Sequence, residues 1–231
     1  MKQNRLKRKK NRLEVHLPKF ITNLFPDAIW TIPNPGKEIF LSFDDGPVPE
    51  VTPEVLDLLR KEGIKATFFC VGENVLKYPE VYHQIIDEGH AVGNHTYNHF
   101  NGLKKRNSIY IKNIEKAGRL IESNLFRPPY GFMKWSQYHT IKKRYKIIMW
   151  DVISCDYDRN RSKETVLSNV MDNVRPGSII TFHDSVRAYD NLMYTLPKVI
   201  RELKAQGYQF KKIEFDKESS PGNPDNRKQL T

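Results

Sequence analysis

Short apolar runs alternate along the chain with longer segments in which apolar residues recur every three or four positions. The short runs predict strands and the longer segments predict helices. Strands are expected over residues 38–43, 66–71, 91–93, 146–150, 178–182 and 208–213, and helices over 52–62, 78–88, 108–123, 162–174 and 192–206. Apolar strands that alternate with helices are typical of a parallel sheet covered on both faces, or of an α/β barrel.

This alternation spans about residues 37–214, which we expect to form a single domain. Residues 1–19 are predicted to be a flexible basic arm, and residues 20–36 a lead-in segment that packs aromatic side chains on the domain. Residues 215–231 are mostly polar and charged, which predicts a disordered tail. No apolar run reaches the roughly 18 residues that cross a bilayer, and no signal-peptide pattern follows the arm. These features predict a cytoplasmic protein.

Charge is unevenly distributed along the chain. The net charge is +11, and residues 1–12 alone contain seven Lys and Arg and no acid, so the rest of the chain is close to neutral. Such an arm can attract a polyanion or an anionic membrane surface, although a plain solvated terminus has the same composition. No zinc-finger, RNP or GXXG pattern is present, so specific recognition of nucleic acid is not expected. The two cysteines exclude a disulfide scaffold and a multi-cysteine zinc site.

Ionisable residues gather at the ends of the predicted strands, which is where α/β folds carry their function. Asp44 and Asp45 follow the first strand in the run 42–47, SFDDGP. Two adjacent carboxylates repel each other and require a nearby cation or metal ion. The alternative is that one of them forms an Asx turn before Gly46 and Pro47.

His95 and His99, in the run HTYNH, are four residues apart. On a helical turn they would share one face and could bind one ion, although surface histidine pairs also occur by chance. Combined with a strand-end aspartate they give three ligands and leave positions open for water. That set suits a hydrolytic Zn²⁺ or a similar divalent ion.

Three further segments carry candidate chemistry. In RPPYG, Arg127 brings a permanent charge, and the prolines fix a backbone path that can aim the amide of Tyr130 at a ligand, unless the segment is only a rigid surface turn. Residues 150–158 place aromatic and acidic side chains after a strand. His183 ends another strand, and its near-neutral pKa suits a general acid, although a hydrogen-bonded structural histidine is the alternative.

Taken together and in this order, the five segments resemble the NodB-type polysaccharide deacetylases, carbohydrate esterase family four, over about residues 37–213. SFDDGP matches the family's T/S-F-D-D-G-P motif, HTYNH matches H-S/T-x-x-H, and RPPYG matches R-x-P-Y/F. Residues 150–157 correspond to the fourth motif and residues 181–183 to the fifth. The resemblance implies a distorted (β/α) barrel, a divalent metal ion that is usually Zn²⁺, and a hydrolase that removes N-acetyl groups from amino-sugar polymers.

The resemblance also implies a role for individual residues. Asp45, His95 and His99 correspond to the metal ligands, and Asp44 to the general base with Arg127 as its partner. Tyr130 corresponds to the donor of a backbone N–H to the oxyanion, and His183 to the general acid. The remaining motif positions imply contacts with an N-acetylated glycan of the chitooligosaccharide or peptidoglycan type by Trp150, Tyr157, Thr181 and Phe182.

The sequence departs from the family pattern in the fourth and fifth motifs. Ile153 stands where the family has the aspartate that pairs with the histidine of the fifth motif. Either Asp151 or Asp156 supplies that carboxylate, or His183 has a lower pKa and acts differently. Tyr157 replaces a tryptophan, and Thr181 replaces a leucine. Two alternatives to the deacetylase therefore stay open: a hydrolase of a non-sugar amide, which the lack of an export signal favours, and a carbohydrate-binding pseudoenzyme, which Ile153 favours.

Overall fold

The structure is a computed structural model that describes residues 22–34 and 36–215. The predicted basic arm lies outside the described residues, as do residues 20, 21 and 35 of the predicted lead-in and residues 216–231 of the predicted tail. Within the described part of the chain, no helix is long and apolar enough to span a membrane.

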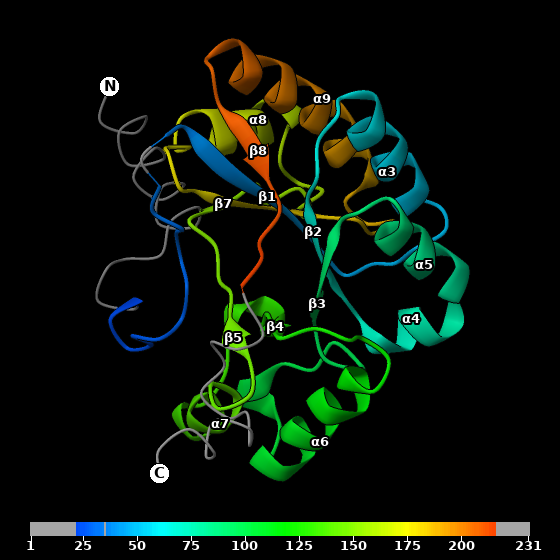
Figure 1. Ribbon diagram of the computed structural model, residues 1–231, viewed down its shortest axis with the longest axis vertical. Helices are drawn as coiled ribbons and strands as arrows, with labels where there is room; N and C mark the ends of the chain where they lie inside the picture. The colour runs from blue at the N-terminus through cyan, green and yellow to red at the C-terminus, as the bar shows by residue number, and fades with distance from the viewer. Residues whose placement is uncertain (1–21, 35, 216–231) are drawn as a thin grey trace, which may run out of the picture.

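The described residues form one eight-stranded sheet, which curls into a half-barrel (Figure 1). Its main path has the order β5-β4-β3-β2-β1-β7-β6, with β8 also paired to β1, and all of these pairings are parallel. The strands are β1 (Glu38–Asp44), β2 (Thr67–Cys70), β3 (Ala91–Asn94), β4 (Leu125–Phe126), β5 (Lys146–Ile147), β6 (Val152–Ile153), β7 (Ile179–His183) and β8 (Gln209–Lys211). The predicted α/β fold and distorted barrel are therefore confirmed.

Helices cover the outside of this sheet (Figure 1). The α-helices are α3 (Thr52–Lys61), α4 (Gly72–Lys77), α5 (Pro79–Asp87), α6 (Asn107–Gly118), α7 (Trp135–Ile141), α8 (Lys163–Met171) and α9 (Tyr189–Ala205), and the 3₁₀ turns are η1 (Gly102–Lys104) and η2 (Pro129–Gly131). All five predicted helices are present, with ends that differ by up to five residues. The sequence did not predict α4, α7, β4 and β6, because they are too short to show a clear period.

The predicted strand over residues 146–150 is only partly right, since β5 ends at Ile147. Beyond that point the backbone turns to other partners. Ile148 forms an isolated bridge with Ile29 of the lead-in, and Met149 donates its N–H to the carbonyl of Ile29. The carbonyls of Ile148 and Met149 both accept hydrogen bonds from Arg127. This interruption leaves the backbone carbonyls pointing at the buried guanidinium of the site.

Aromatic side chains build the core on both sides of the sheet. Phe43 stacks on Phe68 with ring centroids 4.9 Å apart, and the ring of Phe182 lies 6.3 Å from that of Phe43 in the same cluster. Phe126 and Tyr138 belong to a second cluster under α6 and α7. Each fully buried side chain of this size contributes roughly 1.5–3 kcal/mol. The packed layers hold the strands, and therefore the strand ends, in fixed positions.

The register of the sheet brings the strand ends together at one edge. Asp44 of β1 lies beside His183 of β7, and Cys70 of β2 lies beside Asn94 of β3. Asn94 in turn lies beside Phe126 of β4. Asp44 and His183 were themselves singled out from the sequence, as were Asp45, His95 and Arg127, which directly follow three of these positions. Parallel pairing therefore gathers these residues along one side of the half-barrel.

Candidate active site

A fully buried ion pair forms the base of the site. Arg127 Nη1 donates to Asp44 Oδ1 at 2.6 Å, and the side chains are 0% and 5% exposed. The same nitrogen donates to Ser42 Oγ at 2.9 Å, and the guanidinium lies over the ring of Phe69. With its bonds to the carbonyls of Ile148 and Met149, the guanidinium is held on every side. The carboxylate of Asp44 is therefore held beside a cation that cannot move away.

Beside this pair, Asp45, His95 and His99 converge on one point. One ligand atom from each lies within 4.8 Å of the other two. Nε2 of His99 is 3.1 Å from Asp45 Oδ1, and Nε2 of His95 is 3.8 Å from the same oxygen. Although burial alone would raise it, the hydrogen bond from His99 and the charges of His183 and His99 hold the pKa of Asp45 below its usual range. The three side chains come from two strand ends that the sheet places close together.

The donor set fits a divalent metal ion. His95 Nδ1 donates to the carbonyl of Arg127 at 2.8 Å, since a carbonyl can only accept, and this fixes the tautomer so that Nε2 carries the lone pair facing Asp45. Burial lowers the pKa of His95 to about 4, so its ring is neutral at neutral pH. Two imidazole nitrogens and one carboxylate oxygen form a donor set that suits Zn²⁺ and leaves positions open.

The loop that carries the two histidines is not a helical turn, which corrects the geometric reason given for their pairing. Residues 95–101 contain no helix, and Thr96 and His99 have φ of 65° and 52°. Side chains from outside the loop compensate for this conformation. Asn113 of α6 accepts hydrogen bonds from the backbone N–H groups of Tyr97 and Asn98, at 2.9 and 3.1 Å. The histidines meet because the loop is held in a left-handed path rather than because of helical spacing.

Asn113→Ala is therefore expected to weaken ion binding without removing a ligand. Loss of the amide leaves two backbone N–H groups of the loop without acceptors, which costs about 1–3 kcal/mol. By analogy with other residues that orient ligands, affinity for Zn²⁺ should fall about 10–100-fold in a calorimetric titration. Asn107→Ala, which removes an amide of the same helix that bonds Ser136 and not the ligand loop, is the control. Equal affinity in the Asn113 variant and the wild type would show that the loop does not depend on α6.

The turn after Arg127 presents its backbone in a strained form. Tyr130 has a φ of 62°, and its ring is 57% exposed and lies 4.7 Å from the ring of His99. Gly131 follows with a φ of 72°, and a Cβ atom there would lie 2.4 Å from the indole of Trp150. A left-handed tyrosine costs on the order of 1–3 kcal/mol, and such strain clusters at functional sites. Trp150 therefore supports the turn from below.

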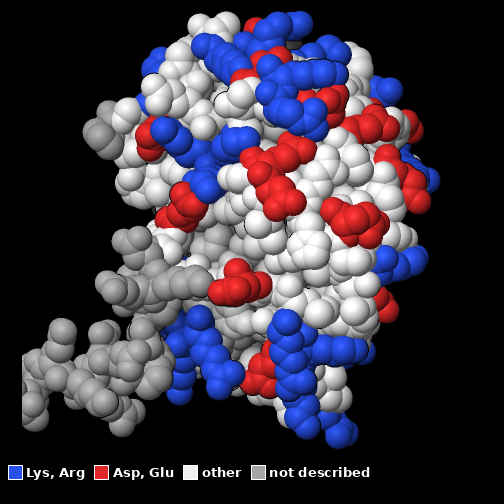
Figure 2. Space-filling model, turned by 45° about the vertical axis from the view of Figure 1, so that its right-hand side comes forward, with Lys and Arg blue, Asp and Glu red and all other residues white. Residues whose placement is uncertain are grey.

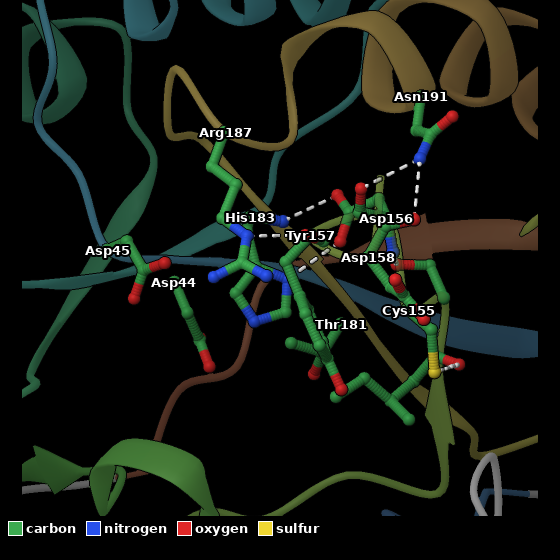
Figure 3. A network of polar contacts seen from close by, with 12 residues as sticks. Asp44, Asp45, Cys155, Asp156, Tyr157, Asp158, Thr181, His183, Arg187 and Asn191 are labelled. Atoms are coloured by element: carbon green, nitrogen blue, oxygen red, sulfur yellow. Dashed lines mark hydrogen bonds and ion pairs between the residues drawn. The ribbon is translucent and has the colours of Figure 1, made fainter. Parts of the chain in front are cut away.

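His183 is held by a buried carboxylate (Figure 3). Its Nδ1 lies 2.7 Å from Asp156 Oδ1, and its backbone N–H donates to Asp156 Oδ2 at 2.9 Å. Asn191 of α9 donates to the carbonyl of Asp156, and Arg187 donates to the carbonyl of Tyr157. Burial would lower the pKa of His183, but the charge and hydrogen bond of Asp156 raise it to about 9. The ring thus carries a proton at neutral pH, close to Asp44 and Asp45.

Of the two candidate partners of His183, Asp156 makes the contact and Asp151 does not. Asp151 accepts two hydrogen bonds from Arg175, at 2.8 and 3.0 Å, and one from Ser178 at 2.7 Å. It therefore ties β7 to the segment before β6. Ile153 is the last residue of β6, and Asp156 reaches His183 from the loop three residues further on.

Asp156→Asn should change how the stability of the protein and the protonation of His183 depend on pH, because it removes the charge that pairs with His183. The pKa of His183 lies above the value of about 6.5 in an unfolded chain, so the pair stabilises the fold fully below about pH 6.5, and this contribution is lost as the pH rises through 9. It amounts to on the order of 3 kcal/mol. The variant should lose this dependence, and the protonated fraction of His183 at pH 7.5 should fall from nearly all to about a tenth.

Urea unfolding at several pH values and an NMR titration of the histidines measure both effects. Asp151→Asn is the matched control, since it removes the charge and one of the two acceptor oxygens that bind Arg175 and Ser178 and should leave the titration of His183 unchanged. If the Asp151 variant moved the pKa of His183 as far as the Asp156 variant does, the assignment of the partner would fail.

Of the four predicted substrate contacts, Tyr157 lies beside the site, whereas Trp150, Thr181 and Phe182 are buried. The ring of Tyr157 meets the ring of His183 edge-on at 4.8 Å, beside the site. Trp150 is 9% exposed and supports the turn at Gly131. Thr181 and Phe182 are fully buried: Thr181 hydrogen-bonds Ser42 beneath Arg127, and Phe182 packs in the aromatic core. Their side chains therefore offer no surface to a substrate, which corrects their assignment as contacts.

Sequence reasoning gave no role to two residues that hold the site. Ser42 accepts from Arg127 within a strand that otherwise appears plainly apolar. Asp184, directly after His183, accepts from the N–H of Gly46 at 3.1 Å and from the hydroxyl of Thr52 at 2.6 Å. A Cβ on Gly46 would lie 2.0 Å from the Asp184 carboxylate, so only glycine allows this contact next to Asp45. The position of Asp184 at a strand end was the only signal.

Comparison with known proteins places this geometry in context. The family model described as polysaccharide deacetylase matches residues 31–146. A curated relative from Bacillus cereus, named peptidoglycan-N-acetylglucosamine deacetylase, is 35% identical over 188 residues, which are 78% of this chain and 88% of the relative. The match of the family model includes the first three motifs, whereas Asp156 and His183 lie beyond it.

Two solved structures show how far the likeness extends. The peptidoglycan N-acetylglucosamine deacetylase Bc1960 has a TM-score of 0.77 at 33% identity, over 85% of this chain and 95% of its own. BA3943 from Bacillus anthracis, a pseudoenzyme of the CE4 family, has a TM-score of 0.72 at 27% identity, over 80% and 67% of the two chains. The chain thus shares its fold with both an enzyme and a pseudoenzyme. The fold alone does not distinguish the two, so the distinction depends on the side chains of the site.

Proposed function

Because the chain belongs to the polysaccharide deacetylase family, carbohydrate esterase family four, we propose that it is a metal-dependent hydrolase that removes N-acetyl groups from an amino-sugar polymer. The substrate class we propose is a glycan of the peptidoglycan or chitooligosaccharide type, and the product released is acetate. The observation that carries the proposal is the convergence of Asp45, His95 and His99 beside two largely buried pairs, Asp44 with Arg127 and His183 with Asp156.

The ligand set of Asp45, His95 and His99 would hold one divalent ion, with Zn²⁺ as the proposed species. When bound, such an ion supplies Lewis acidity to the acetyl carbonyl and to water. The carbonyl of Arg127 keeps the ring of His95 oriented for that purpose. The left-handed backbone at Thr96 and His99 shapes the loop so that His99 lies beside His95.

We assign the proton transfers to the residues on either side. Asp44 accepts a proton from the attacking water while Arg127 holds the carboxylate in position, and the water oxygen bonds to the acetyl carbon. The amide of Tyr130 donates a hydrogen bond to the oxyanion that forms. As the carbon–nitrogen bond breaks, His183 gives its proton to the leaving nitrogen, because an amine leaves poorly as an anion. Asp156 stabilises the charged form of His183 until then.

The alternatives differ in what supports them. The pseudoenzyme interpretation depended on Ile153, and the contact between Asp156 and His183 removes that argument. The non-sugar amidase interpretation makes the same use of the site and differs only in the substrate. We therefore favour an active deacetylase of amino-sugar polymers over both.

The test is acetate release from chitotetraose and from peptidoglycan fragments, followed by mass spectrometry of the glycan. A chelator should abolish the release, and Zn²⁺ should restore it. Binding of Zn²⁺ and glycan without release of acetate would support the pseudoenzyme instead. Acetate release from simple N-acetyl amides but from neither glycan would support the non-sugar amidase.

A further inference from the structure

The charged residues after the basic arm are unevenly distributed along the sequence, although the net charge of residues 13–231 is close to zero. Residues 101–146 contain twelve Lys and Arg and two acidic residues, whereas residues 13–100 and 147–231 together have a net charge of −6. Only Arg127 among these cations is part of the site. In Figure 2 one group of basic side chains lies at the lower end of the molecule, where Figure 1 shows α6 and α7, and a second group lies at the upper end among acidic side chains.

Several of these cations have no acidic partner. Within the described ranges, no carboxylate pairs with Lys104, Arg106, Lys112 or Lys143. Cations elsewhere on the surface are commonly paired, as with Lys61 and Asp57. An unpaired cluster of one sign produces an outward field that attracts anions.

Large apolar side chains are exposed within the same surface. Leu103, Phe132 and Trp135 are 49%, 51% and 51% exposed. The two segments that carry them lie side by side, because Lys134 Nζ donates to the carbonyl of Lys105 at 2.7 Å and Asn107 donates to Ser136 Oγ at 2.6 Å. We call this surface the basic–aromatic face, and it consists of Leu103, Lys104, Arg106, Phe132, Lys134 and Trp135.

The geometry points to an anionic phospholipid membrane as the partner of the basic–aromatic face. Lysine and arginine near a membrane are attracted by its negative surface potential, while Trp, Phe and Leu insert at the boundary between headgroups and acyl chains. A soluble polyanion would engage the cations and leave the exposed apolar side chains without a function. The combination therefore favours a lipid surface.

Two neighbouring features strengthen this assignment. The ring of Phe25 lies 5.9 Å from the ring of Trp135, so the beginning of the described chain lies next to the face, and the sequence before it contains the seven cations of residues 1–12. Tyr130, whose ring meets His99, is two residues from Phe132. Docking through this face would hold the opening of the candidate active site close to the membrane.

The first experiment measures binding of the full chain to sedimented vesicles. Vesicles of phosphatidylcholine with phosphatidylglycerol should bind the protein, those of phosphatidylcholine alone should not, and high salt should weaken binding. The double variant Lys104→Gln/Arg106→Gln should bind about tenfold more weakly. It should release acetate from soluble chitotetraose at the wild-type rate, which separates failure of this proposal from failure of the proposed function.

The matched control is Lys61→Gln/Arg201→Gln, which removes the same charge from α3 and α9 and keeps residues 1–12. It should bind vesicles like the wild type. An equal loss in both double variants would overturn the proposal, because binding would then follow net charge rather than the basic–aromatic face. Equal binding to both kinds of vesicle would also overturn it.

The second experiment uses the three tryptophans, of which Trp135 is exposed and Trp150 is 9% exposed. Anionic vesicles should shift the fluorescence to the blue and protect it from acrylamide, because Trp135 enters the interface. Leu103→Ser, which changes no charge, should weaken vesicle binding. Tight binding to soluble polyphosphate together with vesicle binding that causes no blue shift would identify a polyanion site instead and overturn the proposal.

Discussion

Asp44→Asn is expected to slow acetate release by a factor of about 10²–10⁴ while the protein stays folded and binds its ion. The amide cannot accept the proton of the attacking water, which is the step assigned to the carboxylate. It has nearly the same shape, and its oxygen can still accept from Arg127 Nη1. The ligand atoms on Asp45, His95 and His99 are untouched.

Steady-state kinetics on chitotetraose with a parallel Zn²⁺ titration measure this. Asp158→Asn, in the loop next to His183 and paired with Arg161, is the control and should keep most of the activity. If the Asp44 variant were as active as the wild type, another group would have to be the base. If it lost the ion as well, the loss of activity would not report on proton transfer.

Arg127→Met is expected to lower the free energy of unfolding by about 3–5 kcal/mol. The substitution leaves Asp44 buried without its counterion and leaves the carbonyls of Ile148 and Met149 without their donor. Typical domains are stable by only about 5–15 kcal/mol, so the loss should be visible as a large fall in the urea midpoint.

The double variant Arg127→Met/Asp44→Leu separates the charge from the packing. Replacement of both charges by apolar groups removes the uncompensated carboxylate, so the double variant should be more stable than Arg127→Met alone and still inactive. If the two variants unfolded at the same urea concentration, the penalty would come from the lost carbonyl bonds rather than from the charge.

The chemistry of the site was more predictable from the sequence than its geometry. Asp44, Asp45 and His183 could be found because parallel strands bring their carboxyl ends to one edge, and the observed register of β1 and β7 places Asp44 beside His183. The left-handed path of the loop after His95 could not be found, since Asn113 of another element supports it by accepting from Tyr97 and Asn98. Short strands such as β6 carry no periodic signal, so the choice between Asp151 and Asp156 needed the fold.

Arg127 contributes to both halves of the site through different atoms. Its guanidinium binds Asp44, and its carbonyl binds the ring of His95. A backbone shift at this single residue would displace the proton acceptor and the ion-binding imidazole in concert. Redesign aimed at a different acyl group has little freedom in the RPPYG turn. The loop around Tyr157, which touches neither interaction, offers a more independent place for substitutions beside His183.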